Sequence, residues 1–228
     1  MRHALVLLAL APTFACASVI QPGFADPGGV HAPEAGSVTV AVHGGGLAEV
    51  GFPSLGAGGA VRVTKQLDDG FGFGGEAFGG GGRMSTHDVY FTPSPVVTGG
   101  ARGFLDQRPS RNVLIRLGAS ASATTTATSK SISPVALLDA EIAIAPEDVD
   151  TLEPYAFAGA TAGGMISQGT PLPLAGVHVG AGARVAVGDA WHVHGGGVVE
   201  SRSVMLPEML MGFISPTVIA SVGVSHTF

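Results

Sequence analysis

From residue 37 to residue 228, apolar side chains alternate with small or polar ones, and this period of two is the strongest constraint on the fold. A period of two is that of a β-strand, in which successive side chains point to opposite faces. No run of about eighteen apolar residues occurs, so the chain carries no signal for a transmembrane helix. The alternation divides at turn residues into about ten strands, near 37–44, 57–66, 70–79, 96–105, 112–123, 135–146, 153–165, 175–187, 191–203 and 215–228.

Composition narrows the class of β protein. Only 12% of the residues are charged while 46% are hydrophobic, which would leave a soluble domain short of surface charge. The 36 glycines suit strands that approach each other closely better than helices. A net charge of -6 argues against a nucleic-acid partner. We therefore expect an all-β, up-and-down antiparallel transmembrane β-barrel of about ten strands, or eight if the weak first hairpin does not form.

The two faces of the expected strands differ in polarity. In 177–187 the odd positions are all Val or Ala, whereas His178 and Arg184 are even. In a membrane barrel the apolar face meets lipid and the polar face lines the lumen. The same parity collects a nearly balanced set of charges in the lumen: Arg62, Glu76, Arg102, Arg116, Asp139, Glu141, Arg184, Glu200 and Arg202. Because an unpaired buried ion costs several kcal/mol, we expect ion pairs and a narrow or plugged lumen.

The connections predict an orientation. Short turns alternate with longer loops, as in barrels whose short turns face the periplasm. Aromatic residues lie beside the short turns or at the C-terminus, where rings favour the membrane interface. We expect this girdle to comprise Phe71, Phe73, Tyr155, Phe157, Trp191 and Phe228, with both chain termini in the periplasm.

The first 36 residues differ from the rest. Residues 1–17 have the charged start and short apolar core of an export signal. Residues 18–36 are rich in Pro, Gly and Ala and predict a flexible periplasmic tether, so the barrel would span 37–228. Cleavage after Ala17 is one interpretation. In the other, Thr13-Phe14-Ala15-Cys16 resembles a lipobox, which implies lipidation of Cys16, the only cysteine.

The last strand resembles the C-terminal signature of bacterial outer-membrane barrels, because Val218, Val222, Val224 and Phe228 share one face. His226 stands on that face where the family more often has an aromatic or apolar residue. Glu153-Pro154-Tyr155 and the strands that follow resemble small barrels of the outer-membrane protein A type. The resemblance implies the outer membrane of a Gram-negative bacterium, with membrane lipids and the barrel-assembly machinery as partners and an unknown surface ligand. Members of the family that this chain resembles have structural, adhesive, transport and enzymatic roles.

The sequence favours a non-enzymatic barrel with a structural, surface-interaction or small-solute role, and predicts no cofactor or metal. Two alternatives remain open. A barrel hydrolase or acyltransferase acting on lipid or peptide at the outer surface would use His192 and His194, which share a face with Glu200, as acid, base or metal ligands. Adjacent Ser225 and His226 point to opposite faces and cannot form a nucleophile–base pair. The other alternative is a secreted soluble β-sandwich lipoprotein.

Overall fold

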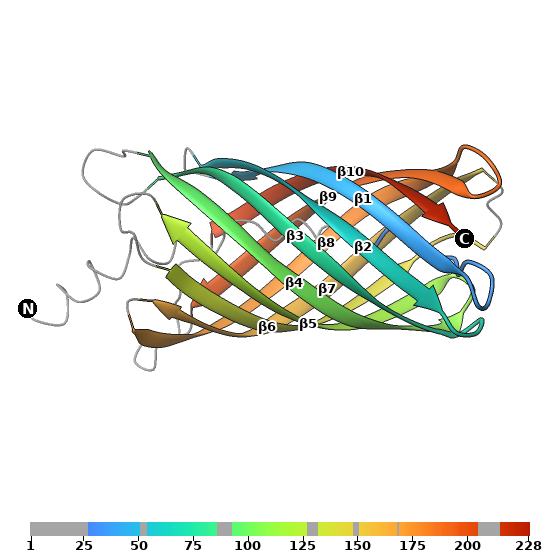
Figure 1. Cartoon of the computed structure of the whole chain (residues 1–228), viewed down its shortest axis with the longest axis horizontal. Coiled ribbons are helices and arrows are strands. Elements are labelled where there is room, and N and C mark those ends of the chain that lie inside the picture. Colours follow the sequence, from blue (N-terminus) through green and yellow to red (C-terminus); the bar gives the residue numbers. More distant parts are fainter. Residues whose placement is uncertain are drawn as a thin grey trace, which may run out of the picture.

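The computed structural model describes residues 27–50, 54–85, 93–126, 132–147, 151–167, 169–204 and 215–228, which form one closed antiparallel β-barrel (Figure 1). No helix among these residues is long and apolar enough to cross a membrane. The ten strands are β1 (Val38–Glu49), β2 (Leu55–Gln66), β3 (Phe71–Ser85), β4 (Pro93–Ser110), β5 (Val113–Thr126), β6 (Ile132–Ile144), β7 (Leu152–Ser167), β8 (Thr170–Ala186), β9 (Trp191–Val204) and β10 (Ser215–Thr227).

Each strand pairs with the next along the chain, and β1 pairs with β10 to close the ring. The prediction of a ten-strand barrel is confirmed, whereas the eight-strand barrel and the β-sandwich are wrong. The end that carries Phe228 and the start of β1 is called the C-terminal end below, and the opposite end is called the far end (Figure 1).

Most strands reach further toward the far end than the sequence predicted. β3 includes Gly80–Gly82 and β8 begins at Thr170, although both stretches were expected in long loops. A Cβ at Gly82 would lie 2.5 Å from the carbonyl oxygen of Leu55, and one at Gly163 would lie 2.1 Å from that of Ala136. These glycines allow close strand approach and do not mark turns. The connections at the two ends therefore differ less in length than expected, which weakens the orientation argument drawn from them.

Prolines set where several ladders begin at the far end. Pro95, Pro134, Pro173 and Pro216 lie in β4, β6, β8 and β10, and each directly precedes the first residue that pairs with the following strand of the ring. Proline lacks the N–H that a ladder needs, so pairing on that side starts one residue later.

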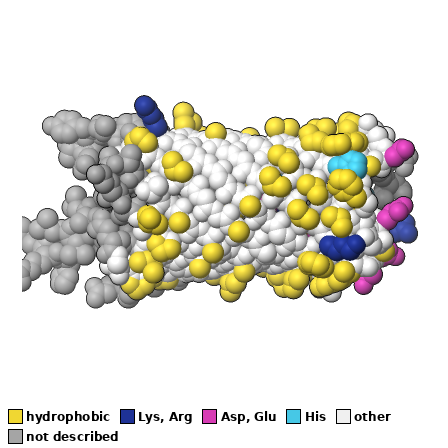
Figure 2. Space-filling view, viewed as in Figure 1, with side chains coloured by type: hydrophobic (Ala, Val, Ile, Leu, Met, Phe, Trp, Pro, Cys, Tyr) yellow, Lys and Arg dark blue, Asp and Glu magenta, His cyan; other side chains and the backbone are white. Residues whose placement is uncertain are grey.

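The wall separates two environments. Large apolar side chains such as Val42, Leu105, Ile142 and Val222 are exposed on the outside. Figure 2 shows hydrophobic side chains spread along the wall on the face that it presents, with acidic side chains confined to one end. Most buried side chains inside the ring are polar or charged. The barrel is thus apolar outside and polar within, the arrangement that a lipid environment requires.

Candidate functional site: the barrel lumen

A network of ion pairs fills the middle of the lumen. The Arg62 guanidinium donates to the Glu76 carboxylate from β2 to β3, with Nε and Oε2 2.8 Å apart. His43 of β1 places its Nε2 3.3 Å from the same oxygen. All three side chains are buried, so the network joins three neighbouring strands from the inside.

Arg116 and Asp106 form a two-pronged pair between β5 and β4, with N···O distances of 2.7 and 2.8 Å. Arg102 of β4 makes a second such pair with Asp139 of β6. The ring of Phe104 lies among the cations, with its centre 4.4 Å from the Arg116 guanidinium carbon and 5.5 Å from that of Arg102. Such contacts between cations and aromatic rings add to the stabilisation that the ion pairs provide.

The other expected lumen charges pair in the same way. Glu141 of β6 lies 3.2 Å from His178 of β8, measured from Oε2 to Nε2. Arg202 donates to Glu200 within β9. Arg184 of β8 pairs with Glu153 of β7 at 2.7 Å. All nine residues expected in the lumen network lie inside the ring, and each has an oppositely charged or histidine partner.

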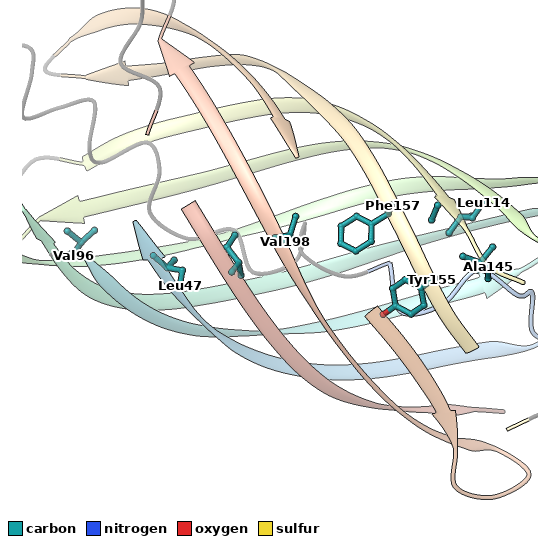
Figure 3. Close-up of a cluster of buried hydrophobic side chains, with 10 residues drawn as sticks. Leu47, Val96, Leu114, Ala145, Tyr155, Phe157 and Val198 are labelled. Carbon is teal, nitrogen blue, oxygen red and sulfur yellow. The ribbon is translucent and has the colours of Figure 1, made fainter. Parts of the chain in front are cut away.

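A segment that precedes the barrel, Pro27–His31, occupies the C-terminal end of the lumen; we call it the plug. The Val30 side chain is fully buried and belongs to an apolar cluster with Leu114 and Tyr155 (cluster in Figure 3). The backbone N–H groups of Val30 and His31 both donate to Oε1 of Glu153. Arg108 donates to the Val30 carbonyl at 2.9 Å. The lumen therefore holds this stretch through its backbone N–H and C=O groups and through one buried apolar side chain.

Two glycines allow the plug to fit. Gly28 and Gly29 have φ of 79° and 113°, a region that disfavours side chains. A Cβ on Gly29 would also lie 2.9 Å from Nε of Arg184. The expectation of a flexible tether over 18–36 is wrong for the plug, because hydrogen bonds and burial hold it. Residues 18–26 of that tether, the signal segment and Cys16 lie outside the described residues.

A polar cavity of about 430 Å³ lies beside the plug at the C-terminal end. His192, Ser225 and Asp189 line it, and the register places His192 opposite Ser225. No hydrogen bond joins these three described residues, so they do not form a catalytic triad. The described part of the chain also holds no group of three metal-ligating side chains.

His192 and His194 do not lie close to Glu200, the acid that was considered as their partner. The His194 ring packs edge-on against His43, with ring centres 5.7 Å apart, while Glu200 faces His178 across the β8–β9 ladder. The barrel-enzyme alternative therefore stays a prediction.

The aromatic girdle is only partly as expected. Phe71, Phe73, Trp191 and Phe228 are exposed on the outside near the C-terminal end. Tyr155 and Phe157 were assigned to the girdle wrongly, because they are 4% and 3% exposed and face the lumen (Figure 3). They lie two and four residues after Glu153, which also faces inward, so the strand period puts all three on one side.

His226 completes the girdle that remains. Its ring centre lies 4.5 Å from that of Trp191 on β9 and 4.3 Å from that of Phe228. The residue that departs from the C-terminal signature that this strand resembles, His226, thus still places an aromatic ring among aromatic rings.

Sequence reasoning missed four charged or histidine residues that form the ion pairs and plug contacts of the lumen: His43, Asp106, Arg108 and Glu153. Asp106 and Arg108 were placed in a turn, but β4 continues to Ser110. Glu153 stands near the start of β7, where parity alone would have put it inward. His43 has the inward parity of β1, a strand too rich in glycine to be read with assurance.

Comparisons with known proteins found similar structures only. No family model and no curated protein matches the chain. Among solved structures, an outer-membrane channel from Pseudomonas putida F1 is 11% identical over 89% of this chain and 99% of that one, with a TM-score of 0.47. The beta domain of the Bordetella autotransporter BrkA is 12% identical over 86% and 100%, with a TM-score of 0.47. The translocator domain of the autotransporter NalP from Neisseria meningitidis is 11% identical over 87% and 91%, with a TM-score of 0.43.

Proposed function

We propose that this protein is an integral outer-membrane barrel with a closed lumen, which has a structural or surface-interaction role and does not form an open pore. The observation that carries the proposal is the filling of the lumen by paired charges and by the plug. Ion pairs such as Arg62–Glu76 and Arg116–Asp106 link neighbouring strands inside the ring, and Arg102–Asp139 reaches across β5. The plug then covers the C-terminal end.

Placement in the outer membrane is supported by the apolar exterior and by the exposed rings near the C-terminal end. We orient this end toward the periplasm, because the closing strand ends there and the exposed aromatic rings gather there. The partners proposed with this placement are membrane lipids and the barrel-assembly machinery, with any surface ligand bound at the far end.

Membrane placement is tested with the full-length protein in isolated membranes. Carbonate should leave it in the membrane pellet, and the detergent-solubilised protein should migrate differently on a gel before and after boiling. Release by carbonate would contradict the proposal.

Closure is tested in planar bilayers. The wild-type protein should give no steady conductance, whereas an open, water-filled lumen would conduct continuously. Stable channels of the wild type would contradict a closed lumen while leaving membrane placement intact.

A second role, gated passage of a small solute, is favoured by one observation. The plug is not part of the wall, and its hydrogen bonds to the wall come mainly from the side chains of Glu153 and Arg108. Glu153→Gln keeps the size of the side chain but weakens its acceptor oxygens and its pairing with Arg184. Under this second role the variant should conduct when the wild type does not, and the exposed-site variant Glu147→Gln should stay closed.

A further inference from the structure

At the far end, the β6–β7 ladder stops before the two strands do. The last pair of this ladder is Val135–Met165, although β6 continues to Ile132 and β7 continues to Ser167. On their other sides both strands remain paired, β6 with β5 as far as Ile132 and β7 with β8 as far as Ser167. Pro134 has no N–H to continue the β6–β7 ladder. We call this unpaired stretch, residues 132–134 of β6 and 166–167 of β7, the seam. Each of the two strands is still paired with its other neighbour there.

A cavity of about 550 Å³ lies at this seam. Its lining comes from both faces of the wall: Pro134, Ala136 and Pro171 from the outward face, and Val135, Met165 and Leu172 from the inward face. Ser122 has the only polar side chain among the described residues that line it, and none of them is charged. The site thus suits hydrocarbon and offers nothing that would bind a charged headgroup.

The lumen behind the seam is apolar as well. Leu137, Met165, Leu172 and Leu174 are buried together there, with Val135 packed against them; we call these five residues the leucine cluster. The next inward residue of β6 is Asp139, which belongs to the charged network. The leucine cluster therefore ends where the ion pairs begin.

The edge of the cavity nearest the middle of the barrel, at Ala136, lies at membrane depth. Ala136 is eight residues from Ile144, the last residue of β6 at the C-terminal end. At about 3.3 Å per residue and a tilt of about 40°, this is roughly 20 Å along the barrel axis. The hydrocarbon band of such barrels is about 25 Å tall. The cavity is thus level with lipid chains, near the far border of the band.

We propose that the β6–β7 seam binds one acyl chain of a lipid from the surrounding membrane, with the end of the chain against the leucine cluster. This inference rests on the proposed membrane placement. It identifies a lateral site that is distinct from the plugged, polar C-terminal end of the lumen.

Whether the acyl chain reaches the leucine cluster is tested with a tryptophan inside the barrel. In a Trp191→Phe background, Leu172→Trp places the reporter in the leucine cluster. Leu47→Trp is the matched control, because Leu47 is also buried and near the far end, but it lies on β1. In phosphatidylcholine vesicles with brominated acyl chains, Leu172→Trp should lose fluorescence and Leu47→Trp should not. Equal quenching of both, or of neither, would overturn the proposal.

Stoichiometry gives a second test that leaves the interior unchanged. Ala136→Phe fills the seam from outside, whereas Ala140→Phe puts the same ring on the same outward face of β6, four residues away. After reconstitution with phosphatidylethanolamine and release into detergent, native mass spectrometry should find one lipid on the wild type and on Ala140→Phe. Ala136→Phe should retain none.

Retention by all three proteins, or by none, would overturn the acyl-chain site. Each protein is also run unboiled and boiled on a gel and extracted with carbonate. Release from the membrane would mark failure of the membrane proposal, which is a different result from loss of the bound lipid.

Discussion

The lumen near the C-terminal end and the lumen behind the β6–β7 seam are enclosed by the same hydrogen-bonded wall but filled by different chemistry. The first holds paired charges such as Arg116 and Asp106, together with the plug. The second holds Leu137, Met165, Leu172 and Leu174. Strand pairing is common to both regions, so the inward side chains alone make them different. The charged region requires a particular oppositely charged partner for each side chain, whereas the leucine cluster requires only apolar groups that fill its volume.

The largest loss of stability should come from removing one member of an ion pair in the charged region. Asp106→Ala leaves Arg116 buried without its two-pronged partner. Removing one member of a buried ion pair costs about 3–5 kcal/mol, and we expect a loss of this size in urea unfolding from lipid vesicles. Glu147→Ala, at an exposed site, should change the unfolding midpoint little. A loss below about 1 kcal/mol for Asp106→Ala, as for an exposed pair, would show that the lumen is wet.

The apolar region should respond to lost volume. Leu137→Ala removes a buried side chain from the leucine cluster, a change that costs about 2–5 kcal/mol in protein cores. The adjacent Leu138 is 66% exposed on the outer wall and serves as the control. Unfolding in lipid vesicles should show a clearly smaller loss for Leu138→Ala. Equal losses would mean that the cluster is not packed as a core.

The plug should be the easiest part to displace. Gly29→Val introduces a clash with Arg184 and a side chain at positive φ, so we expect stability to fall by roughly 1 kcal/mol and, if the plug gates the lumen, bilayer conductance to rise. Gly36→Val is a close control, because Gly36 also has a positive φ but nothing within 4 Å of its Cβ position. Equal conductance of the two variants would assign the effect to backbone strain and not to loss of the plug.

The smallest effect is expected on the outer wall. His226→Ala removes two ring contacts, but lipid acyl chains replace most of the lost contact area, so we expect the unfolding free energy to fall by less than about 1 kcal/mol. The emission of Trp191 should shift, and His226→Phe should restore the wild-type spectrum. A spectrum of His226→Phe that stays like that of His226→Ala would mean that the imidazole has a polar role.

Alternation was enough to predict the barrel, the strand count and the inward side of the nine charged residues assigned to the lumen. It did not predict partners, because pairing across the lumen depends on register: Arg102 lies opposite Glu76 and Ser120 but binds Asp139, two strands away. It failed at Tyr155 and Phe157, where proximity to a turn was given more weight than parity. The plug left no sequence signal, since the five residues Pro27–His31 have no period and include two glycines and a proline, which are typical of a linker.

The position of the plug also constrains the order of events in folding. Thr39 of β1 contacts Thr227 of β10, 188 residues along the chain, so ring closure is the most non-local step. Only residues 32–37 separate the plug from β1, which means that it travels with the first strand. When β1 and β10 pair, the plug is enclosed in the same step, and Glu153 and Arg108 gain their hydrogen bonds to the plug backbone.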